Sequence, residues 1–148
     1  MEEGLGDVEL ADPAQKLVLV VDDEESQQDL LKHIVGKEGF RLDLAKDGSE
    51  ALRKVEAMSP DLIILDLMLP GTSGYEVLRG LQSTGNGNIP VIVLTARTMD
   101  RKMVEMVRQE SNVREFVQKP ASPLILASTL HNILRTCPPA VKRTPKKG

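Results

Sequence analysis

The sequence predicts an α/β protein in which helices cover both faces of a parallel sheet. Short runs rich in Val, Ile and Leu alternate with helical patterns about five times, as right-handed strand–helix–strand units do. Three of these runs, LVLVV, LIIL and VIVL, are apolar throughout, which is typical of parallel strands buried on both faces. Four runs end abruptly on a charged or hydroxylated residue, and ligands of such sheets bind at the carboxyl ends of the strands.

The first two strands and the helix between them follow from local signals. A strand is expected at about residues 17–21, and a helix begins near Ser26. Gly39 is placed to end this helix, because glycine adopts the left-handed conformation of a helix C-terminus at no steric cost. Residues 41–45 alternate polar and apolar side chains, which indicates an edge strand with one wetter side.

The middle of the chain repeats the same strand and helix units. Asp47 or Ser49 is expected to cap the second helix. The third strand ends on Asp66, and a further helix and a Gly/Asn-rich turn precede a fourth strand at about residues 90–94. These units extend the predicted sheet to four strands.

The last third of the chain completes the pattern. A methionine stripe at helical spacing is interpreted as core filling; it comprises Met99, Met103 and Met106. Asn112 is expected to stop this helix with a positive φ, which asparagine tolerates well. A last strand contains Val113 and Phe116. Ser122 as N-cap and Pro123 in the first turn begin a final helix, which reaches about residue 135.

Composition limits the classes of function. A chain of 148 residues, 41% hydrophobic, supports one ordinary core. Aromatic residues make up only 2%, and the net charge is −3 without a basic stripe, which argues against direct nucleic-acid binding. A lone Cys137 favours a reducing compartment. No run approaches the roughly 20 apolar residues of a membrane span, so we expect a cytoplasmic, soluble protein.

Three segments are expected along the chain. Residues 1–15 are acidic with little apolar periodicity, and are predicted to be a flexible leader. Residues 16–136 hold the predicted domain. Residues 137–148 are rich in proline and basic residues, which is typical of a tail or a linker.

The residues that end the strands have a common chemistry. Each can bind phosphate or a hard cation, and they are Asp22 and Asp23, Asp66, Thr95, and Lys119. Because the carboxyl ends of parallel strands meet at one edge of the sheet, these side chains are expected to form one site.

A magnesium-dependent phosphoryl site fits these residues. Three neighbouring carboxylates repel one another, and an all-oxygen cluster without cysteine suits Mg2+ better than Zn2+. Both histidines, His33 and His131, fall inside predicted helices. Asp66 is the candidate nucleophile, because an ionised carboxylate can attack phosphorus without a general base. Lys119 and the Thr95 hydroxyl would stabilise phosphoryl oxygens, while the acid pair would hold the metal.

At this point the chain resembles the receiver domain of two-component response regulators, over about residues 16–135. The resemblance rests on the residues at the strand ends together with local motifs. The motifs are Ala45-x-Asp47-Gly48-x-Glu50-Ala51-Leu52, Asp66-x-Met68-x-Pro70 with Gly74, and Lys119-Pro120. It implies a flavodoxin-like fold with strand order 2-1-3-4-5.

The resemblance also implies a function and roles for residues. Asp66 would accept a phosphoryl group from a histidine kinase or a phosphotransfer protein, and the acyl phosphate would hydrolyse slowly, so the chain would act as a signalling module rather than an enzyme. Mg2+ would be held by Asp22, Asp23, Asp66 and the backbone carbonyl of Met68. The switch residues would be Thr95 and Phe116, and the bond between Lys119 and Pro120 would be cis.

The chain departs from the family pattern at several positions. Asn112-Val113 stands where family members often have Gly-Ala, and Phe116 where they often have Tyr. Met68 and Arg97 occupy positions that flank the site and tend to tune the phosphoryl lifetime.

Two other functions of similar folds fit these residues less well. A phosphatase of the haloacid dehalogenase type needs a second acid where this chain has Met68, and Asp22-Asp23-Glu24-Glu25 would repel the phosphate of a flavin. A phosphorylation-independent interaction module with the same fold is the remaining alternative. The output domain or partner is left open. We expect a partner or a second copy on the Met-rich helix, the last strand and the last helix, where the exposed residues would be Ile125, Leu126 and Thr129.

Overall fold

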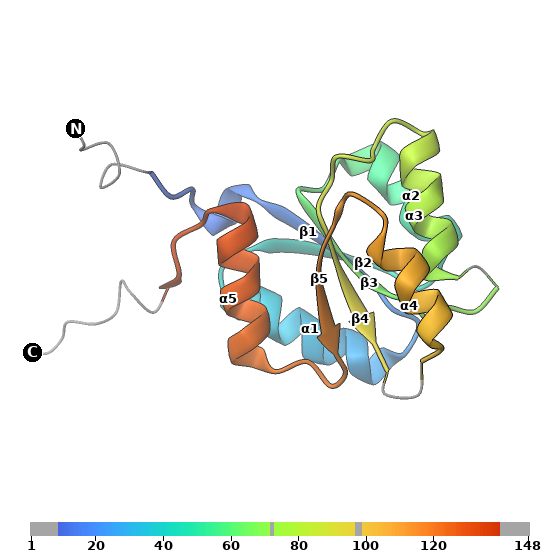
Figure 1. Ribbon diagram of the computed structural model, residues 1–148. Coiled ribbons are helices and arrows are strands. Elements are labelled where there is room, and N and C mark those ends of the chain that lie inside the picture. Colours follow the sequence, from blue (N-terminus) through green and yellow to red (C-terminus); the bar gives the residue numbers. More distant parts are fainter. Residues whose placement is uncertain (1–8, 72, 97–98, 140–148) are drawn as a thin grey trace, which may run out of the picture.

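Five parallel strands form a single sheet in the order β2-β1-β3-β4-β5, with helices on both faces (Figure 1). The structure is a computed structural model, and it describes residues 9–71, 73–96 and 99–139. The strands are β1 Leu17–Val21, β2 Arg41–Ala45, β3 Leu62–Asp66, β4 Val91–Thr95 and β5 Val113–Gln118. The helices are α1 Glu25–Lys37, α2 Gly48–Met58, α3 Gly74–Ser83, α4 Arg101–Arg108 and α5 Pro123–Leu134. The predicted fold class and strand order are confirmed.

Two aliphatic cores lie on opposite faces of the sheet. α1 and α5 cover one face, and the core there is built around Val18, Val20, Leu31, Ile64 and Leu126. α2, α3 and α4 cover the other, around Leu19, Val55, Ile63, Leu78 and Val107. Alternate residues of β1 and β3 enter each core, which is why these strands are apolar throughout and fully buried.

Most of the predicted helix ends are confirmed. The Asp47 carboxylate accepts a hydrogen bond from the Glu50 N–H at the start of α2, and the Ser122 hydroxyl accepts one from the Ile125 N–H at the start of α5. Gly39 follows α1 with φ +95°, as expected of a left-handed C-terminal glycine. β2 lies at the edge of the sheet, as its alternating pattern indicated.

The expected role of Asn112 was wrong. Among the described non-glycine residues only Ser59 and Arg135 have a positive φ, and α4 ends at Arg108, before Asn112 is reached. The Asn112 side chain is buried instead, where its amide donates to the Ile89 carbonyl at 3.1 Å. It therefore ties the loop before β5 to the loop before β4.

Part of the predicted leader packs against the domain. Pro13–Gln15 forms a short 3-10 turn with Pro13 buried, and Ala11 pairs with Thr136 in a parallel bridge. Residues 1–8 of the leader, 140–148 of the tail, and Arg97 lie outside the described residues. No helix within the described ranges has the length and apolar character needed to cross a membrane.

Candidate functional site

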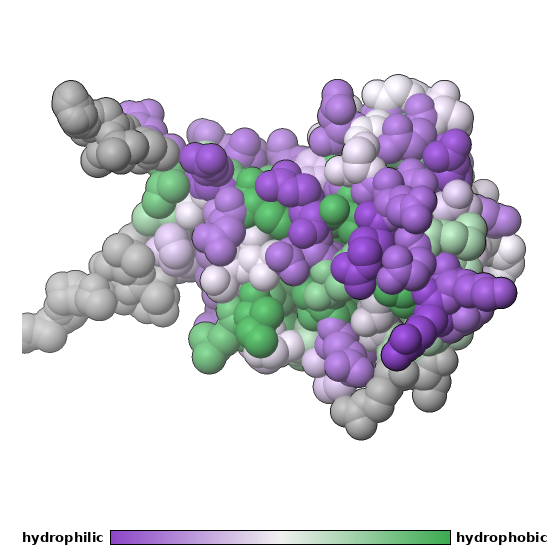
Figure 2. All heavy atoms as spheres, viewed as in Figure 1, coloured by the Kyte–Doolittle hydropathy of each residue, from purple (hydrophilic) through white to green (hydrophobic). Residues whose placement is uncertain are grey.

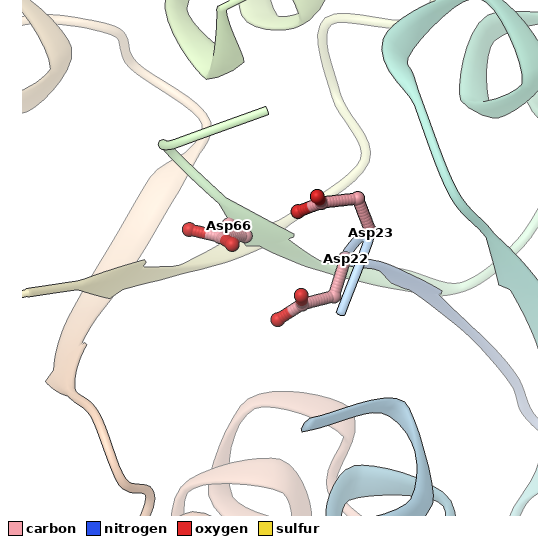
Figure 3. A group of neighbouring side chains, drawn as sticks. All are labelled: Asp22, Asp23 and Asp66. Atoms are coloured by element: carbon pink, nitrogen blue, oxygen red, sulfur yellow. The ribbon is translucent and has the colours of Figure 1, made fainter. Parts of the chain in front are cut away.

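The acid pair and Asp66 meet at the carboxyl edge of the sheet because their strands are neighbours. Asp22 and Asp23 directly follow β1, and Asp66 is the last residue of β3, which pairs with β1. Each side chain offers a carboxylate oxygen, and these atoms lie within 4.8 Å of one another (Figure 3). Asp22 and Asp66 are buried, whereas Asp23 is exposed. The site is therefore rooted in the sheet and open on one side.

Lys119 completes the cluster from the end of β5. Its ammonium nitrogen lies 2.9 Å from Oδ2 of Asp66 and 3.9 Å from Oδ2 of Asp22. The backbone N–H of Lys119 donates to the Thr95 carbonyl at 2.8 Å, which fixes the segment beside the end of β4. The peptide bond between Lys119 and Pro120 is cis. The structure thus brings together four of the five residues at the strand ends by their side chains, and Thr95 by its backbone.

The buried position of Asp22 changes the acidity of its carboxyl group. Burial raises the pKa of Asp22 from its ordinary value of 3.8 to about 6, and the neighbouring Asp66 carboxylate adds to this, although the Glu24 N–H lowers it in part. Oδ2 of Asp22 is buried and accepts no hydrogen bond from the described residues. A buried carboxylate oxygen without a donor is costly, so this atom is suited to a cation.

At Lys119 the neighbouring carboxylates outweigh the effect of burial on the pKa. Burial alone lowers the pKa of the Lys119 ammonium, but the hydrogen bond to Asp66 and the charges of Asp66 and Asp22 raise it overall. The lysine is therefore held in its charged form beside Asp66. An ammonium in this position can stabilise additional negative charge at Asp66.

Three further donors hold the acids at the site, and of these the Glu24 N–H and the Gln28 amide were not predicted. The Glu24 N–H donates to Oδ1 of Asp22 at 3.0 Å, and the Met68 N–H donates to Oδ1 of Asp66 at 3.0 Å. The Gln28 side-chain amide donates to the Asp22 carbonyl. Backbone donors of this kind leave no signal in a sequence, whereas Gln28 lies one helical turn past Glu24 and faces the same end of α1.

Gly74 shapes the loop that carries Asp66. A Cβ atom built on Gly74 would lie 2.7 Å from Cα of Leu67 and 3.1 Å from the Asp66 carbonyl, so a side chain there would displace backbone. We expect Gly74→Ala to lower the free energy of unfolding by about 1–3 kcal/mol in urea denaturation. Gly36→Ala is the matched control, because its Cβ would meet only Leu42 Cδ2 at 3.8 Å, and it should raise stability by about 0.5–1 kcal/mol. Equal effects of the two changes would contradict the close approach.

Thr95 and Phe116 line a common cavity of about 410 Å³ between β4, β5 and α4. Phe116 is half-buried on β5, and the Arg108 guanidinium carbon lies 4.7 Å from the centre of its ring. Both residues predicted to switch therefore border the same open space. This geometry provides room for movement of either side chain.

The donor set fits a hard divalent cation. The oxygens come from carboxylates alone, one of them accepts no hydrogen bond from the described residues, and no cysteine or histidine of those residues joins the group. The ammonium of Lys119 lies 2.9 Å from Oδ2 of Asp66, so the same cluster also contains a positive charge that can pair with an anionic group.

A flavodoxin-like sheet with an acidic cluster and a lysine at its carboxyl edge defines a signal-receiving domain of two-component systems. The response regulator receiver domain family matches residues 18–131. The chain belongs to this family, whose domains form the receiving part of response regulators.

Individual relatives agree with this assignment. The chain is 37% identical over 124 residues to the DNA-binding response regulator MtrA of Mycolicibacterium smegmatis, covering 84% of this chain and 53% of that protein. It is 39% identical over 118 residues to the sensory transduction protein RegX3 of the same organism, covering 80% and 50%. The chain thus spans about half the length of these curated relatives. A crystal structure of the signal receiver domain of a histidine kinase from Syntrophus aciditrophicus matches with TM-score 0.72 and 32% identity, over 90% of this chain and 97% of that one.

Proposed function

We propose that the chain is a phospho-acceptor module, in which Asp66 receives a phosphoryl group and a surface for a partner changes in response. The observation that carries the proposal is the position of Asp66. Its carboxylate is buried at the end of the central strand, with a lysine ammonium at 2.9 Å and two further carboxylates beside it. The phosphoryl donor would be a phosphohistidine of a histidine kinase or of a phosphotransfer protein.

The proposed step exchanges one bond to phosphorus for another. A carboxylate oxygen of Asp66 forms a bond to phosphorus while the bond from phosphorus to the donor imidazole breaks, and the imidazole keeps the electron pair. Because Asp66 is held by the Met68 N–H through Oδ1 and by Lys119 through Oδ2, its orientation is fixed before the donor arrives. Lys119 stabilises the charge that develops on the acyl phosphate, and the Thr95 hydroxyl donates to a phosphoryl oxygen.

Mg2+ is the proposed cofactor. Asp22, Asp23, Asp66 and the Met68 backbone carbonyl would hold it, as the family resemblance implies. When bound, Mg2+ neutralises charge on the transferring phosphoryl group and on the acids around it. Oδ2 of Asp22 supports this assignment, because it accepts no hydrogen bond from the described residues and has the Lys119 ammonium only at 3.9 Å, so that a cation would supply further compensation.

The proposed switch links this site to a surface. Thr95 would move toward the phosphoryl group, and Phe116 would turn into the cavity that the two residues share. The surface formed by α4, β5 and α5 would then bind an output partner, a downstream domain or a second copy of the chain. Figure 2 shows apolar side chains gathered over α5 and hydrophilic ones over α4 on this face.

The residues exposed on this surface differ in part from the prediction. Ile125 is 60% exposed, but Leu126 is fully buried in the core, because it faces the sheet from the next position of α5. Met106 is also exposed on α4, so the methionine stripe only partly fills the core. The proposed contact residues on α5 are therefore Ile125 and Thr129, whose hydroxyl donates to the Ile125 carbonyl at 2.8 Å.

The test is the intact mass of the chain after incubation with acetyl phosphate and Mg2+, and with EDTA in place of Mg2+. We expect one added phosphoryl group with Mg2+ and at least about tenfold slower addition with EDTA, because the charge on the cluster is then uncompensated. No addition under either condition would overturn the proposal, and would favour the phosphorylation-independent interaction module.

A further inference from the structure

The two ends of the described domain meet at the pole opposite the site. Residues 10–16, here called the strap, run into the start of β1, whereas Asp22 follows its other end. Figure 1 shows the strap beside the segment that leaves α5. The Ala11 N–H donates to the Arg135 carbonyl at 2.8 Å, and the Cys137 N–H donates to the Ala11 carbonyl at 3.1 Å. The strap is thus hydrogen-bonded to the residues on both sides of Thr136.

Buried side chains next to this contact reinforce it. The His131 ring is buried on α5, with Nδ1 at 2.6 Å from the Thr136 hydroxyl and Nε2 at 2.8 Å from Oε1 of Glu38. The same ring packs against Phe40 with 5.0 Å between ring centres. Thr136 is 2% exposed. One imidazole therefore joins the end of α1, the end of α5 and the residue that pairs with the strap.

Local contacts fix the conformation of the strap. The Asp12 carboxylate accepts from the Ala14 N–H at 2.9 Å and caps the 3-10 turn. The buried Pro13 lies over Gly39, where an added Cβ would approach the Pro13 ring at 3.4 Å. A proline restricts the unfolded chain, so closing this turn costs less conformational entropy than closing a flexible one.

We propose that the strap locks the exit of the chain from α5, so that any segment attached after Cys137 leaves the domain at a fixed position and in a fixed direction. α5 ends at Leu134, and Arg135 turns the backbone with φ +56°. A chain end beyond such a turn is normally mobile unless it is tied down. Here two backbone hydrogen bonds and the buried Thr136 tie it down.

The lock gives the exit a rigid connection to the site. α1 begins just after Asp23 and ends beside Glu38, while α5 begins just after Pro120 and ends beside Thr136. The two helices pack on the same face of the sheet, and the pair of His131 and Glu38 joins their far ends. A segment held by the strap is thus connected to the site through α1 and α5, whose first turns flank the site.

The experiment measures amide hydrogen exchange of the Cys137 N–H by NMR in the full chain. Ala11→Pro removes the donor to the Arg135 carbonyl, and should speed exchange at Cys137 by about tenfold, which is the loss expected for one net hydrogen bond. Glu9→Pro is the matched control, because Glu9 is exposed and directly precedes the strap, and it should change the rate by less than about twofold. Equal rates for Ala11→Pro and the native chain would overturn the proposal, as would equal acceleration by both prolines.

A second variant tests the lock from the other side. Thr136→Val removes the hydroxyl that pairs with His131 while preserving shape, and should also speed exchange at Cys137 by about tenfold, since the imidazole loses a buried partner. The dissociation constant of Mg2+ can be measured by titration of the amide signals near Asp66. It should stay within about twofold of the native value for Ala11→Pro, Glu9→Pro and Thr136→Val, because none of these residues lies at the site. The proposal would also be overturned if the Cys137 N–H of the native chain exchanged as fast as an amide of an unfolded chain.

Discussion

The Asp66→Asn variant is expected to take up no phosphoryl group from acetyl phosphate in the presence of Mg2+. An amide oxygen is a far weaker nucleophile than a carboxylate, and an amide removes one of the charges that the cation and Lys119 compensate. We expect the rate of addition to fall at least about a thousandfold, or about 4 kcal/mol in activation free energy. Intact mass spectrometry over time gives the rate directly.

The control for this change is Asp61→Asn. Asp61 stands before the opposite end of β3, where its Oδ2 accepts from the Leu17 N–H at 2.8 Å, and an asparagine oxygen can accept the same bond. Its rate of phosphoryl addition should remain within about threefold of the native rate, since it lies away from the site. Continued addition to Asp66→Asn at a comparable rate would show that another residue accepts the phosphoryl group.

The second large effect concerns stability, and here we expect Asp22→Asn to strengthen the fold when Mg2+ is removed. The carboxylate of Asp22 is fully buried beside two others, and its Oδ2 accepts no hydrogen bond from any described residue. An asparagine keeps the oxygen that accepts from the Glu24 N–H and places an amide donor toward the other acids. Urea unfolding in EDTA at pH 7.5 should show a gain of about 1–3 kcal/mol.

The gain in the free energy of unfolding should depend on pH, in a direction that follows from the pKa of Asp22. The pKa of Asp22 is about 6 in the folded chain against an ordinary 3.8, so the folded state binds the proton more tightly. The resulting stabilisation is complete below about pH 3.8 and is lost as the pH rises through about 6. The difference between Asp22→Asn and the native chain should therefore be largest above pH 7 and should shrink toward zero near pH 4.

Mg2+ should reverse the order of the two proteins. A cation that binds only the folded state raises stability in proportion to its affinity, and the variant has lost one ligand. Asp29→Asn on the exposed face of α1 serves as control, and should behave as the native chain does in both conditions. A variant that is less stable than the native chain at pH 7.5 in EDTA would contradict the assigned burial cost at Asp22.

The strands were predictable because their hydrophobic signals are dense, whereas their full order followed from the family resemblance. LVLVV and LIIL have no polar position, and only a strand with a core on each side uses such a run, which places β1 and β3 at the centre of the sheet. The alternation in RLDLA correctly predicted an edge position for β2. The residues at the strand ends followed from the same logic, since strand polarity alone places their backbones at one edge.

The remaining features depend on tertiary contacts that no local pattern encodes. Asn112 looks like a helix stop, but its amide finds better partners in the loop before β4, and a buried amide must be paired. Ser59 takes the left-handed conformation that sequence favours for Gly or Asn. The strap has one acid, one base and no helical or strand periodicity, so no local pattern reveals that Pro13 is buried against Gly39.

The meeting of the strap with Thr136 bears on how such a domain can be built into other proteins. Because the Ala11 N–H and the Arg135 carbonyl are 2.8 Å apart, the entering and leaving backbones stand side by side. A module with adjoining ends can be spliced into a surface loop of a host protein without stretching that loop, as domain insertions generally require. The same closeness suits circular permutation, with a short bridge joining the old ends and new ends opened in a distant turn.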